Sequence, residues 1–240
     1  MDRSVDRQAI RCKAGAKTTE DVPLVVEEPL EIRVNGEPLA VLMRTPGDEL
    51  ELAAGFCLTE GVVDSYSEIT LLDICKAAGE NYGNVVNVFV DKDNGATARL
   101  PRALTTGSSC GLCGARMLDE IKRDLTPLAP GPVFPLSEVI ALQYAMFERQ
   151  ELFRRTWGGT HAVALARAGA GLIVVREDIG RHNAMDKVIG HAMREGLDMR
   201  ECIAILSGRI SFEMVQKAVR AKIPVVAAVS AATAMAVELA

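Results

Sequence analysis

Two cysteines separated by two residues, Cys110 and Cys113, are the side chains in this sequence best suited to chemistry. They lie in the glycine- and serine-rich segment 105–114, and a helix is expected directly after it, at about 115–125. A thiol near a helix N-terminus meets unpaired amides and the positive end of the helix dipole, both of which favour the thiolate. Because the thiolate is the form that attacks sulfur or binds a metal, this loop is the first candidate site.

Three functional interpretations of this cysteine pair compete. Half of a zinc or iron–sulfur site would need two more ligands, and Cys57 and Cys75 are distant and not spaced as a second pair. A thioredoxin-like redox pair would sit in a tight strand-to-helix turn, unlike this glycine-rich loop. A persulfide carrier needs an exposed thiolate that can move between a donor and an acceptor, and the loop favours this interpretation.

Two further alternatives are weaker. Cysteines can be buried as small hydrophobic residues, but a polar glycine-rich loop argues against that. Zinc nucleobase deaminases combine a His-x-Glu motif with a later Pro-Cys-x-x-Cys. Here Ser109 precedes Cys110, and no histidine comes before the pair, since the first is His161. The sequence therefore excludes a deaminase of this kind.

Two turns at the ends of apolar strands form the second candidate site. Turns of this type lie where open α/β sheets bind ligands, and the free amides of the next helix attract anions. We therefore expect the two turns to hold the phosphates of a nucleotide, although each turn alone could be only a helix cap with solvated arginines. The candidate cofactor-binding residues are Arg176, Asp178, Gly180, Arg181, His182 and Asn183 in the first turn, and Ser207, Gly208 and Arg209 in the second.

The other conspicuous side chains suggest structural roles. His161 begins an apolar strand, where a histidine with satisfied hydrogen bonds is the expected case, although imidazole can also act as an acid or base. His191 falls within a helix and is expected at the surface. Trp157 is expected either to cover a pocket or simply to pack.

The elements that position these residues follow from hydrophobic periodicity. Strands are expected at 30–34 and 39–43 around the turn Asn35-Gly36, a pair that favours a tight hairpin. A helix over about 48–60 and a strand over 85–90 follow. Further on, helices are expected near 137–152, 183–193 and 212–221, and strands at 161–166, 172–176, 202–206 and 224–229. Apolar strands interleaved with amphipathic helices predict an α/β fold whose sheet is mostly parallel and covered on both faces.

The chain divides into four parts on this basis. Residues 1–23 are polar and unpatterned, so we expect a loose N-terminal leader. Residues 24–126 form a smaller α+β part that carries the cysteine loop. Four prolines within 127–135 mark a linker, because proline disrupts helix and sheet interiors. Residues 136–240 form the α/β nucleotide-binding core.

Composition limits the class of protein further. The 240 residues are 49% hydrophobic and carry a net charge of −5, which fits a soluble globular protein without affinity for nucleic acid from net charge. The uncharged run 223–237 is too short to cross a membrane, and the charged N-terminus is not a signal peptide. Six scattered cysteines indicate reduced thiols, so we expect a cytoplasmic protein.

Long ordered motifs resemble the formate dehydrogenase accessory sulfurtransferase family, FdhD, from about residue 30 onward. The resemblance rests on segments 43–48, 55–61, 109–114, 159–162, 176–187 and 206–209, which read MRTPGD, GFCLTEG, SCGLCG, GTHA, REDIGRHNAMDK and LSGR. It implies a cytidine deaminase-like three-layer core that has a mixed, mostly parallel sheet and no zinc, and a homodimer. It also implies that family members continue beyond residue 240 into an aromatic and basic tail, so this chain is expected to be truncated there.

The resemblance also implies a function. A cysteine desulfurase would supply sulfur as a persulfide on Cys110, the first cysteine of the pair. The sulfur would pass, with Cys113 as a second thiol, to the molybdenum bis(guanine dinucleotide) cofactor before its insertion into formate dehydrogenase. The two turns would then hold the guanine nucleotide. The alternatives are a non-catalytic chaperone that binds this cofactor and a thiol oxidoreductase.

Overall fold

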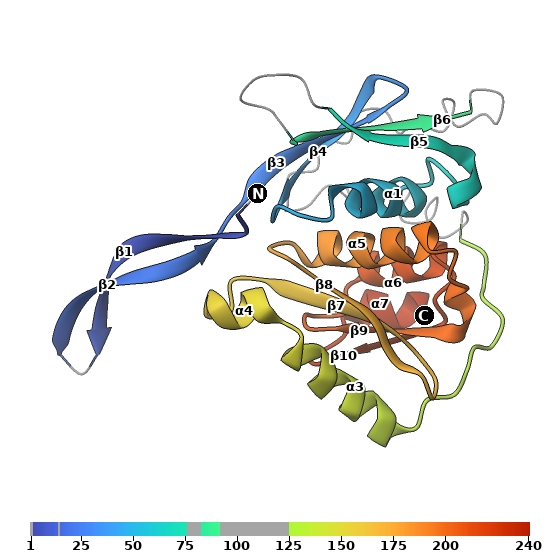
Figure 1. Cartoon of the computed structure of the whole chain (residues 1–240). Coiled ribbons are helices and arrows are strands. Elements are labelled where there is room, and N and C mark those ends of the chain that lie inside the picture. Colours follow the sequence, from blue (N-terminus) through green and yellow to red (C-terminus); the bar gives the residue numbers. More distant parts are fainter. Residues whose placement is uncertain (1, 14, 76–82, 92–124) are drawn as a thin grey trace.

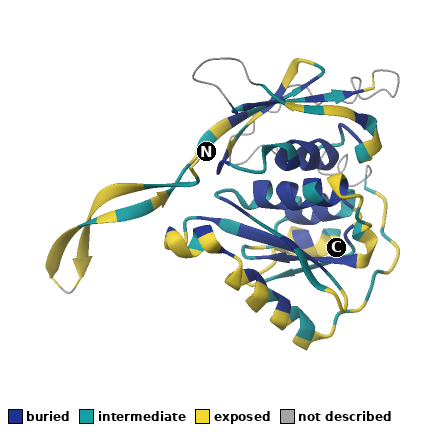
Figure 2. Ribbon diagram, in the orientation of Figure 1, coloured by how far each residue is buried: buried dark blue, intermediate teal, exposed yellow. Residues whose placement is uncertain are grey.

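A two-stranded arm projects from the body of the protein (Figures 1 and 2). The computed structural model describes residues 2–13, 15–75, 83–91 and 125–240. The arm consists of β1 (Ser4–Lys13) and β2 (Ala16–Val25), which pair antiparallel from Ser4 opposite Val25 to Lys13 opposite Ala16. The prediction of a loose leader over residues 1–23 is therefore wrong. Both faces of this ribbon are largely exposed, so its strands lack the apolar alternation by which a half-buried strand is recognised.

The first sheet has the strand order β4-β3-β6-β5. The predicted hairpin is confirmed, with Asn35 and Gly36 both at positive φ, 51° and 89°. Leu30, Ile32 and Val34 alternate inward, as the period of two requires. The strands are β3 (Glu28–Val34), β4 (Glu37–Arg44), β5 (Ile69–Ile74) and β6 (Val85–Val90), and a short 3₁₀ helix, η1 (Tyr66–Glu68), precedes β5.

The second sheet has the order β10-β9-β7-β8 and is mixed, as predicted, but not mostly parallel. β7 runs antiparallel to both β8 and β9, and only β10 and β9 are parallel. The physical reason is that residues 168–170 alone connect β7 to β8, and so short a connection permits only antiparallel pairing. The strands are β7 (His161–Arg167), β8 (Gly171–Asp178), β9 (Cys202–Leu206) and β10 (Val225–Ala228).

Helices cover both faces of this second sheet, as the sequence predicts (Figure 1). Alternate residues of β7 belong to different cores: Ala162 and Ala164 pack toward α3, whereas Val163 and Leu165 pack toward α5. The helices are α3 (Leu136–Glu148), α4 (Glu151–Arg155), α5 (Arg181–Arg194), α6 (Phe212–Arg220) and α7 (Ala234–Leu239), with a short 3₁₀ helix, η4 (Met199–Glu201). Whether this core is specifically cytidine deaminase-like stays a prediction.

One hydrophobic core joins the two sheets through α1 (Glu49–Thr59), which packs on α5. Two glycines allow the backbones to touch at the crossing. A Cβ at Gly55 would lie 1.9 Å from the carbonyl oxygen of Asp186, and a Cβ at Gly190 would lie 1.8 Å from that of Glu51. The two predicted parts thus share a core, and segment 127–135 between them has neither helix nor strand. Within the described ranges, no helix is long and apolar enough to cross a membrane.

Candidate functional site

The candidate site lies at one edge of the second sheet. Because β7 runs antiparallel to β8 and β9, the start of β7 meets the ends of the other two strands. His161, the first residue of β7, is paired with Asp178, the last of β8. Ser207 follows the end of β9 and donates its backbone N–H to Ala162 at 3.0 Å. The turn after β8 and the turn after β9 are thereby brought together, as predicted.

Four cationic or imidazole side chains and one glycine gather at this edge, and we call them the cationic cluster: His161, Arg181, His182, Gly208 and Arg209. Gly208 lies at its centre. A Cβ there would stand 3.3 Å from Nδ1 of His161 and 3.7 Å from Cδ of Arg181. Burial, followed by the charges of Arg181 and Arg209, lowers the pKa of His161. Glycine therefore leaves open the space between these side chains, and His161 lies beside the second turn.

Two polar atoms in the cationic cluster are buried without a hydrogen-bond partner among the described residues: Nε of Arg181 and Nε2 of His182. The nearest carboxylate to His182, that of Glu213, is 3.8 Å away, beyond hydrogen-bond range. Both residues begin α5, whose first turn contains no acidic side chain and whose N-cap, Gly180, supplies no side-chain cap. An anion would satisfy these donors and the free amides of the helix N-terminus.

Asp178 and Asn183 shape the first turn from inside the protein. Asp178 is fully buried and forms an ion pair of 2.8 Å with Nζ of the equally buried Lys187. Its carboxylate also accepts hydrogen bonds from the N–H groups of Thr45 and Gly180, and from Nδ2 of Asn183. That amide nitrogen of Asn183 also donates to the carbonyl oxygen of Met43 at 2.7 Å. Because their partners lie within the chain, these two side chains position the turn that carries Arg181.

Ser207 has the same structural role in the second turn. Its Oγ accepts a hydrogen bond of 2.8 Å from the N–H of Ala162, and its own N–H donates to the carbonyl oxygen of Ala162. The turn after β9 is thus fastened to the start of β7. This reciprocal pair holds Gly208 against His161.

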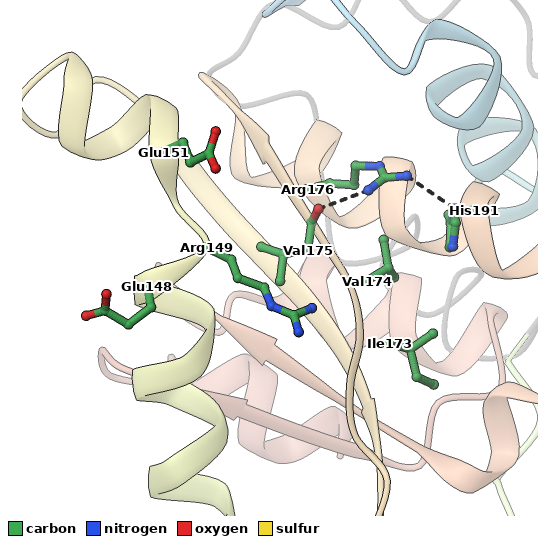
Figure 3. Close-up of a pocket in the computed structure, with 8 residues that line it drawn as sticks. All are labelled: Glu148, Arg149, Glu151, Ile173, Val174, Val175, Arg176 and His191. Atoms are coloured by element: carbon green, nitrogen blue, oxygen red, sulfur yellow. Dashed lines mark hydrogen bonds between the residues drawn. The ribbon is translucent and has the colours of Figure 1, made fainter.

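Arg176 is not brought to the cationic cluster. It donates two hydrogen bonds, of 2.6 and 2.8 Å, to Glu51 on α1, and its guanidinium lies 3.2 Å from Nδ1 of His191. Burial alone would raise the pKa of Glu51, but hydrogen bonds from Arg176 and His191 hold it below its ordinary value. Arg176 and His191 both line a pocket of about 410 Å³ beside β8 (Figure 3). His191, expected at the surface, is half-buried in this network.

Cys110 and Cys113 lie outside the described residues, and their role stays a prediction. Among the described cysteines, Cys57 is fully buried, and burial raises the pKa of its thiol to about 12. A thiol with so high a pKa is a poor nucleophile. The described residues also contain no cluster of His, Cys, Asp and Glu arranged to hold a metal ion.

Sequence reasoning missed the buried charges that support the site. Lys187 lies in segment 176–187, one of the motifs that carry the family resemblance, but nothing in the sequence indicates that it is buried. Lys217 is also buried without any indication in the sequence, and its Nζ donates to both carboxylate oxygens of Asp186 at 2.9 Å. Burial, followed by the charges of Lys217 and Arg181, lowers the pKa of His182 to about 4, so Lys217 also acts on the site. An i, i+3 apolar stripe locates the buried face of a helix, but not a charge that has its partner on another element.

We expect acid to destabilise the protein partly through His182. Its imidazole has a pKa of about 4 when folded against 6.5 ordinarily, so between these values the unfolded chain binds the extra proton. The stability is therefore present above about pH 6.5 and lost as the pH falls toward 4. Urea unfolding at pH 7.5 and pH 5 should show a smaller loss for His182→Gln than for the wild type. An equal loss in both proteins would contradict this assignment.

The fold and site together define a mixed α/β protein that presents a cationic edge built from two strand-to-helix turns. The chain belongs to the FdhD/NarQ family, whose model matches residues 25–240. It is 44% identical to a sulfur carrier protein FdhD of Streptomyces coelicolor, over 98% of this chain and 86% of that protein. It is 41% identical to the sulfur carrier protein FdhD of Mycobacterium tuberculosis, over 98% of this chain and 88% of that protein.

A solved structure shares the fold. The crystal structure of a protein assigned as a formate dehydrogenase accessory protein from Desulfotalea psychrophila superimposes with a TM-score of 0.78 at 23% identity. The match covers 99% of this chain and 88% of that one. The mixed α/β architecture is therefore that of a known protein.

Proposed function

We propose that this chain is a sulfurtransferase that carries sulfur, as a persulfide on Cys110, from a cysteine desulfurase to the molybdenum bis(guanine dinucleotide) cofactor of formate dehydrogenase. Membership of a family whose relatives are named sulfur carriers supports the sulfur chemistry. The cationic cluster carries the rest of the proposal, because unpartnered donors at Arg181 and His182 suit the phosphates of a guanine dinucleotide.

The first step would be a thiol–persulfide exchange. The Cys110 thiolate attacks the outer sulfur of the desulfurase persulfide, the sulfur–sulfur bond of the donor breaks, and the donor cysteine leaves as a thiolate. Cys110 then bears the transferred sulfur. This step needs no oxidant, because one sulfur–sulfur bond forms as another breaks.

Cys113 offers two routes for the second step. Its thiolate can attack the outer sulfur and take over the persulfide, which frees Cys110 as a thiolate. Alternatively it attacks the inner sulfur, which releases hydrosulfide beside the molybdenum and leaves a Cys110–Cys113 disulfide that a dithiol reductant must reopen. Both routes require that the two thiols come within reach of each other, and only the second also consumes a dithiol reductant.

The cofactor would be a bound substrate, held by its phosphates. Arg181, His182, Gly208 and Arg209 have the exposed or unpartnered groups that could contact it, and Gly180 leaves the first amides of α5 uncapped. Four other residues from the predicted binding set would not contact the cofactor and would only support the surrounding structure. They are Arg176, Asp178, Asn183 and Ser207. A cytoplasmic location and the absence of a resident zinc ion remain parts of the proposal.

Mass spectrometry of the intact protein after incubation with a cysteine desulfurase and cysteine tests the sulfur transfer. We expect a gain of one sulfur atom, mapped to Cys110 and absent from Cys110→Ala. If Cys110→Ala loads sulfur as the wild type does, the assignment is wrong. If nucleotide binding persists but no sulfur is ever transferred, the chain is instead a cofactor chaperone.

We expect Arg181→Ala and Arg209→Ala each to weaken binding of guanosine diphosphate by about tenfold or more, because each removes a charge-assisted hydrogen bond to phosphate. Isothermal titration calorimetry measures this loss. Arg200→Ala is the matched control, since Arg200 is exposed and paired with Asp198 away from the cluster. Unchanged affinity in both cluster variants would show that the two turns are purely structural.

A further inference from the structure

Glu213 places a carboxylate beside the cationic cluster. It lies in the first turn of α6, just after the turn that carries Gly208 and Arg209. One of its oxygens is 3.8 Å from Nε2 of His182, and among the described residues it is the only carboxylate within 4 Å of a side-chain nitrogen of the cluster. Both side chains are partly open to solvent, 46% for Glu213 and 36% for His182. The carboxylate therefore borders the space that an anion at the cluster would occupy.

The carboxylate of Glu213 is held in place and kept ionised. Ser211 is the N-cap of α6, but its hydroxyl donates to Oε2 of Glu213 at 2.8 Å instead of capping the helix. Burial alone would raise the pKa of Glu213. Hydrogen bonds from Ser211 and from its own backbone N–H, with the charges of His182 and Arg181, hold that pKa below its ordinary value. A fixed negative charge at this distance favours the protonated form of a histidine.

His182 is nevertheless neutral in the unliganded protein. Burial, followed by the charges of Lys217 and Arg181, keeps the pKa of its imidazole at about 4. A neutral imidazole has a single N–H, whereas the imidazolium donates from both nitrogens. The neutral form can therefore donate either to an anion or to Glu213, but not to both. Its Nε2 is buried and has no hydrogen-bond partner among the described residues, so the side chain is not committed to Glu213.

We propose that Glu213 is a positioning residue that allows His182 to bind phosphate as the imidazolium, so that ligand binding takes up a proton from the solvent. This inference rests on the proposed function, because it needs a phosphate at the cationic cluster. The phosphate charge would offset those of Lys217 and Arg181. The imidazolium would then donate to a phosphate oxygen and to Glu213 together. Because the bound state holds the extra proton, nucleotide affinity should rise as the pH falls.

Two other groups close to His182 titrate in a similar range. His161 belongs to the same cluster, and burial, followed by the charges of Arg181 and Arg209, lowers its pKa. Asp186 lies one turn further along α5, and burial raises its pKa to about 6, but its carboxylate is bonded to Lys217 inside the protein. A His182→Gln variant keeps both groups, so its difference from the wild type isolates the proton on His182.

Isothermal titration calorimetry with guanosine diphosphate, in buffers of different ionisation enthalpy, measures the protons taken up on binding. A phosphate beside the imidazole would raise the pKa of His182 from about 4 to about 6. At pH 5.5 the wild type should therefore take up at least about half a proton more than His182→Gln. Protons bound by the ligand itself contribute to both titrations and cancel in this difference. Between pH 7.5 and pH 5.5, the wild-type affinity should rise about fourfold more than that of the variant.

Glu213→Gln tests the positioning role directly. We expect it to remain folded by circular dichroism and to lose most of the extra proton uptake. At pH 5.5 it should weaken guanosine diphosphate and inorganic pyrophosphate by about the same factor, because the effect acts through phosphate. Glu195→Gln is the matched control and should keep the wild-type uptake. Glu195 is an exposed glutamate at the C-cap of α5, about 20 Å along the helix from His182.

The outcomes separate this inference from the proposed function. Unchanged proton uptake in Glu213→Gln would overturn the positioning role. A loss confined to guanosine diphosphate would also overturn it, since Glu213 would then contact the base. Binding of guanosine diphosphate by the wild type without extra proton uptake refutes this inference alone. If the wild type binds neither ligand at either pH, the nucleotide site of the proposed function is wrong as well.

Discussion

Gly190→Ala is expected to destabilise the protein by about 3 kcal/mol or more, because the new methyl group would meet backbone rather than a movable side chain. A Cβ at this position would lie 1.8 Å from the carbonyl oxygen of Glu51 and 2.9 Å from its Cα. Relief requires α1 and α5 to separate along their whole contact. The reciprocal variant, Gly55→Ala, meets the carbonyl oxygen of Asp186 at 1.9 Å and should behave in the same way.

Urea unfolding followed by circular dichroism measures this effect. Gly196→Ala is the matched control, because Gly196 has a positive φ of 64° but no atom within 4 Å of the added Cβ. It should lose only the strain of that backbone conformation, about 1 kcal/mol. If Gly190→Ala cost no more than Gly196→Ala, the helices would not cross as closely as described.

The second large effect is expected at the buried pair of Asp178 and Lys187. Both side chains are fully buried, and Lys187 also donates to the carbonyl oxygen of Thr45 at 3.0 Å. Removing either charge leaves the other uncompensated in the interior, which costs about 3–5 kcal/mol. We therefore expect Asp178→Ala and Lys187→Met each to lower the unfolding free energy by that amount.

A double-mutant cycle separates this pair from general damage to the core. Asp178→Ala combined with Lys187→Met leaves neither charge of this pair behind, so it should cost clearly less than the sum of the two single changes. Arg200→Ala, which breaks the exposed pair with Asp198, is the control and should leave the urea midpoint unchanged. Simple additivity at positions 178 and 187 would contradict the proposed ion pair.

Much of the fold is predictable from local pattern. Asn35-Gly36 fixes a tight hairpin because both residues tolerate positive φ, and the inward alternation of Leu30, Ile32 and Val34 follows from the pleat of a strand. The apolar stripe of α5 likewise predicts which face of the helix is buried. These features depend only on neighbours within a few residues.

Strand direction and the arm are not local properties. The sequence of an apolar strand does not indicate whether its neighbours run parallel or antiparallel. The prediction of a mostly parallel sheet was therefore wrong. The arm was missed because a ribbon exposed on both faces shows no hydrophobic period.

By itself, the sequence determined the chemistry available to this protein: a thiol pair in a glycine-rich loop and two strand-to-helix turns rich in cations, in motifs that identify a family. The tertiary structure alone decided which side chains of the two turns have partners within the chain. Arg181 and His182 keep buried nitrogen atoms without a hydrogen-bond partner among the described residues, whereas Asp178 and Asn183 bond to Thr45 and Met43, more than 130 residues earlier in the chain. The reason is physical: a motif fixes which groups are present, but burial and distant partners decide which of their hydrogen bonds stay free.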